Sequence, residues 1–219
     1  EGRRRHRYLA FYTSSFGLGT SASLLLAGAL APSLGWRPAF VLLALGPLAA
    51  GALVVWSMPA RRLPVQPAHR TPLLDFRPVL RNRAARSYII GYAAHCFELF
   101  GVRSWMVAFL AFSASLQGGG RAWGAAAAAA AVNLLGPVAS ILGNELAGGY
   151  GRRRTIARIM IASAVMAAAI GFSAPLPWVL VFGLMTVYFL LVMGDSAALT
   201  AGLVIAAEPE RRGASMALH

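Results

Sequence analysis

The chain has 219 residues, of which 58% are hydrophobic and 12% are charged, and its mean hydropathy is positive. Soluble globular domains carry about 25% charged residues, so this composition excludes an ordinary soluble domain and indicates a membrane protein. The formal net charge is +13, which by itself would suit a nucleic-acid-binding protein. Because the arginines lie in short clusters between apolar runs rather than along one basic face, we expect no nucleic acid as a partner.

Six apolar segments follow one another along the chain, and each is long enough to cross the hydrocarbon core, which takes about 20 residues. We expect transmembrane helices at residues 8–34, 38–58, 87–115, 122–149, 156–174 and 178–207. In the fourth segment, Gly136 and Pro137 favour a kink because proline removes a backbone hydrogen bond. The expected fold is therefore an all-α integral membrane protein with six transmembrane helices.

A polar, basic stretch rich in proline separates the second apolar segment from the third. It covers residues 59–86 and is the one long linker that we expect in the chain. The sequence thus divides into residues 1–58, residues 59–86 and residues 87–219.

The arginines predict the orientation of the six segments. Residues 1–7, 59–86, 151–158 and 208–213 contain every arginine except Arg37, Arg103 and Arg121. Six spans place these four stretches on the same side of the membrane, and arginine-rich loops are cytoplasmic. We therefore expect both ends of the chain to be cytoplasmic, in a bacterial cytoplasmic (inner) membrane.

Three ionisable residues, His95, Glu98 and Arg103, lie within the third segment, where such groups usually face a bundle interior or a wet cavity. Because His95 and Glu98 are three residues apart, we expect them on one helix face as a titrating pair. Arg103 lies about 140° around a regular helix from Glu98, and Gly101 would permit a local break between them. Two alternatives remain open: the groups only pin helix packing, or Arg103 reaches the membrane interface beside Trp105.

Two further polar residues lie deep in apolar segments. Asp195 is about half way along the sixth segment, and by elimination we expect it to pair with Arg103, as a proton or cation site or as a structural contact. Asn133 either bridges two helices or contacts a substrate. The candidates for substrate and proton binding are thus His95, Glu98, Arg103, Asn133 and Asp195. The single cysteine and the absence of metal-ligand spacing predict neither a metal site nor a cofactor.

The sequence GGYGRRRTIAR, which joins the fourth and fifth segments, is similar to the cytoplasmic loop motif of the major facilitator superfamily of secondary transporters. Its motif positions are Gly151, Arg152, Arg153 and Arg154. The basic linker resembles the connection between the two six-helix halves of that family. The stretches EGRRRHRYLAF and EPERRGASMALH resemble the same loop in two parallel repeats.

This resemblance implies a twelve-helix fold of which the six segments are helices five to ten. Residues 1–58 would complete the N-terminal bundle and residues 87–219 would begin the C-terminal bundle, with the missing helices of a longer chain as partners. The implied activity is transport of a small solute across a lipid bilayer by alternating access, coupled to protons.

Two other classes of function are alternatives to transport. A membrane receptor or assembly protein that binds without translocating stays open, because Gly148 and Gly149 stand where the family's loop has an acidic and a basic residue. A membrane-embedded enzyme is disfavoured, because the sequence offers no metal-binding histidine pair, nucleophile elbow or phosphate loop.

Overall fold

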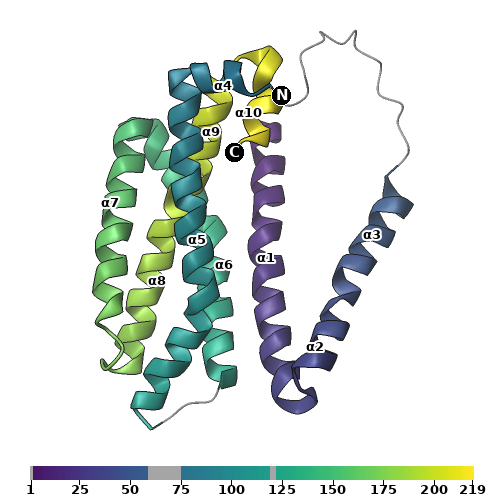
Figure 1. The fold of residues 1–219 in the computed structure, drawn as a ribbon, viewed down its shortest axis with the longest axis vertical. Helices are drawn as coiled ribbons and strands as arrows, with labels where there is room; N and C mark the ends of the chain where they lie inside the picture. The colour runs from purple at the N-terminus through teal and green to yellow at the C-terminus, as the bar shows by residue number, and fades with distance from the viewer. Residues whose placement is uncertain (1, 59–74, 119–121) are drawn as a thin grey trace.

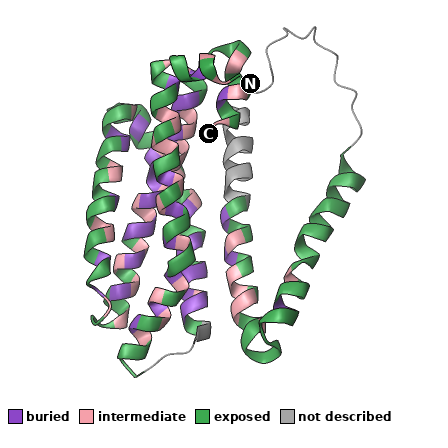
Figure 2. Cartoon of the chain, in the orientation of Figure 1, coloured by how far each residue is buried: buried purple, intermediate pink, exposed green. Residues whose placement is uncertain are grey.

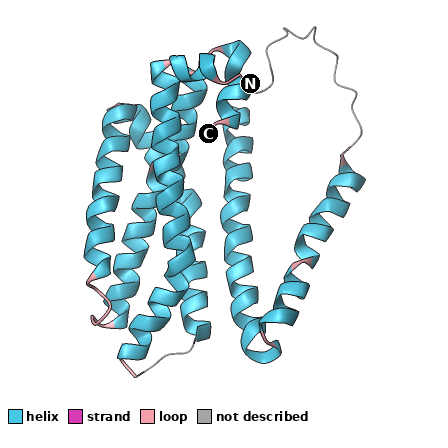
Figure 3. Ribbon diagram, in the orientation of Figure 1, coloured by secondary structure: helices cyan, strands magenta, loops and turns pink. Residues whose placement is uncertain are grey.

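The computed structural model describes the backbone of residues 2–58, 75–118 and 122–219, and the side chains of residues 16–58, 75–118 and 124–219. Residues 59–74 of the expected linker, Arg121 and the side chains of residues 1–15 lie outside the described part. Within those ranges the chain consists of helices and the turns that join them, without a strand (Figure 3). The predicted all-α fold is confirmed.

The six predicted spans are confirmed as six stretches of helix that are long and apolar enough to cross a membrane. In chain order they are α1 (Gly2–Leu34), α2 and α3 (Trp36–Leu43 and Leu45–Ser57), α5 (Arg83–Leu116), α6 (Ala122–Tyr150), α7 (Arg152–Gly171), and α8 with α9 (Trp178–Gly194 and Ser196–Ala206). The short helix α4 (Arg77–Arg81) precedes α5, and η1 (Pro209–Arg211) and α10 (Arg212–Ala217) follow α9.

Helices α5 to α9 pack into one bundle, and α1 lies along α6 at its side (Figure 1). The contact between α1 and α6 is close. Ser21 Oγ donates a hydrogen bond to the carbonyl oxygen of Ala130 at 3.0 Å. A Cβ atom on Gly17 would lie 2.8 Å from Cγ of Pro137. The first span is therefore joined to the bundle by small residues that let the two helix axes approach.

The buried residues line the inner faces of α5, α6 and α8 (Figure 2), where Met106, Leu110, Ala129 and Phe189 form part of one apolar cluster. By contrast, α2 contacts α1, α3 contacts α2, and the outer surfaces of both helices are bare: Trp56 is 86% exposed. An apolar helix surface of this kind fits hydrocarbon surroundings rather than water.

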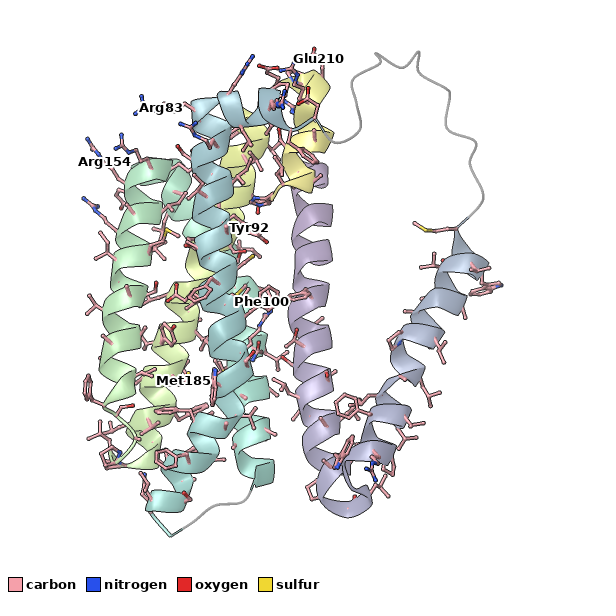
Figure 4. All side chains as sticks on the ribbon, viewed as in Figure 1. Arg83, Tyr92, Phe100, Arg154, Met185 and Glu210 are labelled. Atoms are coloured by element: carbon pink, nitrogen blue, oxygen red, sulfur yellow. The ribbon has the colours of Figure 1, made fainter. Side chains whose placement is uncertain are left out.

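The arginine-rich segments that the structure describes gather at one end of the molecule. Both chain termini, α4 and α10 lie there (Figure 1), and so do Arg83, Arg154 and Glu210 (Figure 4). The opposite end carries the turns that follow α1, α5 and α7. The described helices therefore alternate in direction in the way that the arginine pattern requires.

One membrane-spanning helix of the bundle is interrupted, and it is not the one that contains Gly101. The local break that Gly101 would permit is not formed, because α5 is one continuous helix from Arg83 to Leu116. A continuous helix satisfies its own backbone groups, which is what a hydrocarbon environment favours. The sixth span is interrupted instead: α8 ends at Gly194 and α9 begins at Ser196, with Asp195 between them.

Helix α6 supports this interruption. The backbone N–H of Ala197, in the first turn of α9, donates to Ser140 Oγ at 3.2 Å. Gly143 faces the carbonyl group of Gly194 so closely that a Cβ atom would overlap its oxygen. Two small residues of α6 thus let the broken backbone approach and satisfy one of its free donors.

Candidate functional site

The most buried charged contact joins α5 to the break between α8 and α9. His95 Nδ1 and Asp195 Oδ1 are 2.7 Å apart, and the two side chains are only 1% and 4% exposed. The other ring nitrogen, His95 Nε2, has no hydrogen-bond partner among the described residues. The two contacting atoms, Nδ1 and Oδ1, have no further hydrogen-bond partner in that part of the chain either, so the pair is closed off from water and depends on this one contact.

The predicted pairing of Asp195 with Arg103 is wrong, because Asp195 contacts His95 instead. Eight residues separate His95 from Arg103 on α5, which corresponds to about 12 Å along a helix axis. A single carboxylate between α8 and α9 therefore reaches one of them and not the other. The prediction that Asp195 pairs with Arg103 took only an arginine, which is always charged, as a possible partner. A histidine also supplies a positive charge when it is protonated.

Glu98 faces a different helix from its neighbour His95. Ser163 Oγ of α7 donates to Glu98 Oε2 at 3.1 Å, and the Tyr188 side chain of α8 lies beside the carboxylate. Among the described residues Glu98 forms no ion pair with His95, so the expected direct pair is not formed. Three residues correspond to a rotation of about 60° around the helix, which is enough to turn the two side chains toward different helices.

Arg103 points toward the meeting point of four helices. Its Nε donates to Asn133 Oδ1 of α6 at 3.1 Å. Its Cζ lies 4.7 Å from the ring centroid of Phe16 on α1 and 5.7 Å from that of Phe189 on α8. Trp105 is 74% exposed, whereas the guanidinium is held inside against Asn133, so interfacial placement does not describe Arg103.

Asn133 is 1% exposed and fixes the orientation of that guanidinium. Its Nδ2 donates to the backbone carbonyl oxygen of Ala129 at 2.9 Å, which leaves Oδ1 directed at Arg103. Asn133 thus bridges α5 and α6, one of the two roles expected for it.

Two aromatic side chains extend the His95 site toward the arginine-rich end. The Tyr92 ring stacks on His95 with centroids 5.3 Å apart, and His219 stacks on Tyr92 with centroids 3.6 Å apart. His219 Nε2 lies 2.9 Å from Thr200 Oγ1. Burial lowers the pKa of His219 from its ordinary value, and the nearby charge of His95 lowers it further. Sequence reasoning missed His219 because it lies beyond the last apolar segment.

The loop motif holds three helix ends together. Gly151 has φ of 91° just before α7, a backbone conformation that favours glycine. Arg152 Nη1 then donates to Asn144 Oδ1 of α6 at 3.0 Å and to the carbonyl oxygen of Ala198 of α9 at 2.9 Å. Arg153 and Arg154 are exposed.

These features define the class of protein: a helical integral membrane protein with ionisable side chains buried inside its bundle. No group of three or more potential metal ligands gathers in the part of the chain that the structure describes. The chain belongs to the major facilitator superfamily, because the model of the family described as Major Facilitator Superfamily matches residues 1–219. The family consists of transporters of small solutes rather than enzymes. Searches of curated proteins and of solved structures find no match.

Proposed function

We propose that this chain forms part of a secondary active transporter that moves a small solute by alternating access, and that the His95–Asp195 pair carries the coupling proton. The observation that carries the proposal is the pair itself, with 2.7 Å between His95 Nδ1 and Asp195 Oδ1 and both side chains almost fully buried. Ionisable groups at such depth are costly and commonly mark proton or ion pathways in transporters. The coarser activity, transport of small solutes, follows from the family.

The net charge of the His95–Asp195 pair explains how proton binding would be coupled to a conformational change. With one proton between them, the imidazole and the carboxylate are neutral overall, which a closed apolar site tolerates. Loss of that proton leaves a net negative charge, which burial strongly disfavours. Protonation therefore favours the closed state, and proton release requires that water or a counter-charge reach the pair.

The break before α9 supplies a place where the pair could open. His95 is on the continuous helix α5, whereas Asp195 is between two shorter helices whose backbone is held by Ser140 of α6. A shift of α9 would separate the two groups without unwinding α5. Tyr92 and His219, stacked beyond His95, extend toward the end that carries the chain terminus, and protons would exchange there (Figure 1).

The same proposal assigns each part of the chain to one of the two six-helix bundles or to the linker between them. Residues 1–58 would be the last two helices of the N-terminal bundle, residues 59–86 the linker, and residues 87–219 the first four helices of the C-terminal bundle. The arginine-rich end would face the cytoplasm in a bacterial cytoplasmic membrane. Helix α1 lies against α6, so the contact between the two expected bundles would run along these helices.

The test uses the full-length protein in proteoliposomes that contain a pH-sensitive dye. Labelled organic acids, amines and sugars are offered with and without an acid-outside gradient, and the solute that accumulates is then used for variants. In Asp195→Asn and His95→Gln we expect gradient-driven accumulation to be lost while exchange of solute across the membrane persists. Glu145→Gln, an exposed carboxylate on α6, is the matched control and should behave as the wild type.

Two results would count against the proposal. Gradient-driven accumulation that survives Asp195→Asn at normal expression would remove the pair from coupling. Solute binding without any uptake would favour the alternative, a transporter-like receptor or assembly protein. Glu98→Gln in the same assay tests whether the carboxylate beside Ser163 is a second proton site, in which case the number of protons per solute falls.

A further inference from the structure

We propose that Arg103, held in place by Asn133, and Phe16 form the binding site for a small aromatic carboxylate. This inference rests on the proposed transport function and names the class of solute that it would carry. The carboxylate would lie on the guanidinium of Arg103, and the apolar body of the solute would lie against the ring of Phe16.

The Arg103 guanidinium has N–H donors that form no hydrogen bond with the described residues. Its Nε is the one nitrogen with a hydrogen bond, to Asn133 Oδ1, among the residues that the structure describes. The planar fork formed by its two terminal nitrogens therefore stays open. A guanidinium fork matches a planar carboxylate in two parallel, charge-assisted hydrogen bonds, which makes arginine selective for such groups.

No carboxylate in the described ranges neutralises Arg103. Asp195 is paired with His95, and Glu98 faces Ser163. The remaining described carboxylates are all exposed: Asp75, Glu145, Glu208 and Glu210. A lone cation inside a membrane span is costly, so a site of this kind calls for an anion. The pairing of Asp195 with His95 is what leaves this cation available.

The protein holds the cation in one orientation. Asn133 is 1% exposed and its amide nitrogen is already bonded to Ala129, so its oxygen stays directed at Arg103. A residue that only pinned helices together would not need an open fork. This buried amide instead pre-organises the guanidinium, which lowers the entropy lost when a ligand binds.

The Phe16 ring indicates a solute with an aromatic, apolar body. Phe16 of α1 lies within cation–π distance of Arg103, at 4.7 Å from Cζ, and its side chain is 56% exposed, so it offers a flat apolar surface next to the fork. Phe189 of α8, at 5.7 Å from Cζ, is fully buried and packs against the guanidinium from the core. A solute at this point would therefore touch both the first span and α5. Gly17 packs its backbone onto Pro137 beside these two rings, which brings α1 close enough for Phe16 to reach.

The binding test uses the purified full-length protein with benzoate and phenylacetate as probes. Benzamide and benzylamine serve as neutral and cationic matches of the same shape. Binding is followed by thermal shift and by titration calorimetry, and uptake of labelled benzoate is measured in proteoliposomes. We expect the two carboxylates to bind and the amide and amine not to bind.

The variants locate the site. Arg103→Gln should weaken benzoate binding about 10- to 100-fold, the loss expected for charged hydrogen bonds, and Arg103→Lys should lose part of it because it lacks the fork. Arg86→Gln, on an exposed part of the same helix, is the matched control and should bind as the wild type. If Arg103→Gln does not fold, Phe16→Leu and Asn133→Ala give the same information and should each weaken binding several-fold.

The outcomes separate this inference from the proposed function. Carboxylates that bind no better than benzamide, no binding of either carboxylate, or unchanged affinity in Arg103→Gln would each overturn the inference. Benzoate that binds through Arg103 but never accumulates in a pH gradient would leave the site standing and refute proton-coupled transport. Gradient-driven accumulation of a non-anionic solute that is unaffected by Arg103→Gln would support proton-coupled transport and refute the carboxylate site at Arg103.

Discussion

The close approach of α6 to the break in the sixth span gives a sharp stability prediction. In Gly143→Ala the added Cβ atom would overlap the carbonyl oxygen of Gly194, which belongs to the backbone and cannot rotate away. Overpacking of this kind costs about 1–3 kcal/mol, and a clash with backbone belongs at the upper end. Alanine recovers about 1 kcal/mol of helix propensity over glycine. We therefore expect a net loss of about 2 kcal/mol in the free energy of unfolding.

The matched control is on the same helix. A Cβ atom on Gly148 would meet nothing within 4 Å, so Gly148→Ala carries the propensity gain without the clash. We expect that variant to be neutral or more stable by about 0.5–1 kcal/mol. The two single-methyl changes should thus differ by about 3 kcal/mol, measured as unfolding of purified protein in mixed detergent micelles with increasing dodecyl sulfate.

Equal stability of the Gly143→Ala and Gly148→Ala proteins would refute this reasoning. It would mean that α6 does not approach the carbonyl of Gly194 as closely as described. A functional readout adds a second check. Because the break holds Asp195 against His95, Gly143→Ala should also reduce gradient-driven uptake, whereas Gly148→Ala should not.

Three further changes test the packing around the site. Asn82→Ala should cost about 1–2 kcal/mol of stability, because its side chain caps α5 and also bonds the carbonyl of Ala206; faster hydrogen exchange at the start of α5 would show it. Gly151→Ala should cost about 1 kcal/mol because of its left-handed backbone, read as a lower unfolding midpoint, and no change would contradict the assigned φ. Gly202→Ala should displace the Tyr88 ring and destabilise the protein, and the added change Tyr88→Leu should restore much of the loss; failure of that rescue would place the clash elsewhere.

The spans and their alternation could be predicted because they depend on length, hydropathy and the positions of arginines. Each of these is local in sequence, and the described helices agree with all of them. The ionisable residues inside the spans could also be recognised, since any charge in an apolar run is conspicuous. His95, Asp195 and Arg103 all lie in the interior contacts of the bundle.

The partners of those residues could not be predicted, because they depend on depth and rotation between helices far apart in sequence. Asp195 pairs with His95 and not with Arg103, since the break in the sixth span lies at the level of the first of these. Gly101 and Gly194 each interrupt an apolar run, and the contacts of α6 that support the interruption at Gly194, through Ser140 and Gly143, join residues far apart in sequence. Phe16 was likewise one aromatic residue among many until α1 placed it beside Arg103.

The placement of the described arginine-rich segments at one end has a consequence for biogenesis. The described spans pair into three helical hairpins, α1 with α2 and α3, α5 with α6, and α7 with α8 and α9. By sequence, the first two connections have one arginine nearby each, Arg37 in the first turn of α2 and Arg121 just before α6, and residues 172–177 contain none. In the proposed orientation, with the arginine-rich end in the cytoplasm, insertion hairpin by hairpin would carry at most one arginine across the hydrocarbon per step, and the arginine-rich segments would stay on the cytoplasmic side.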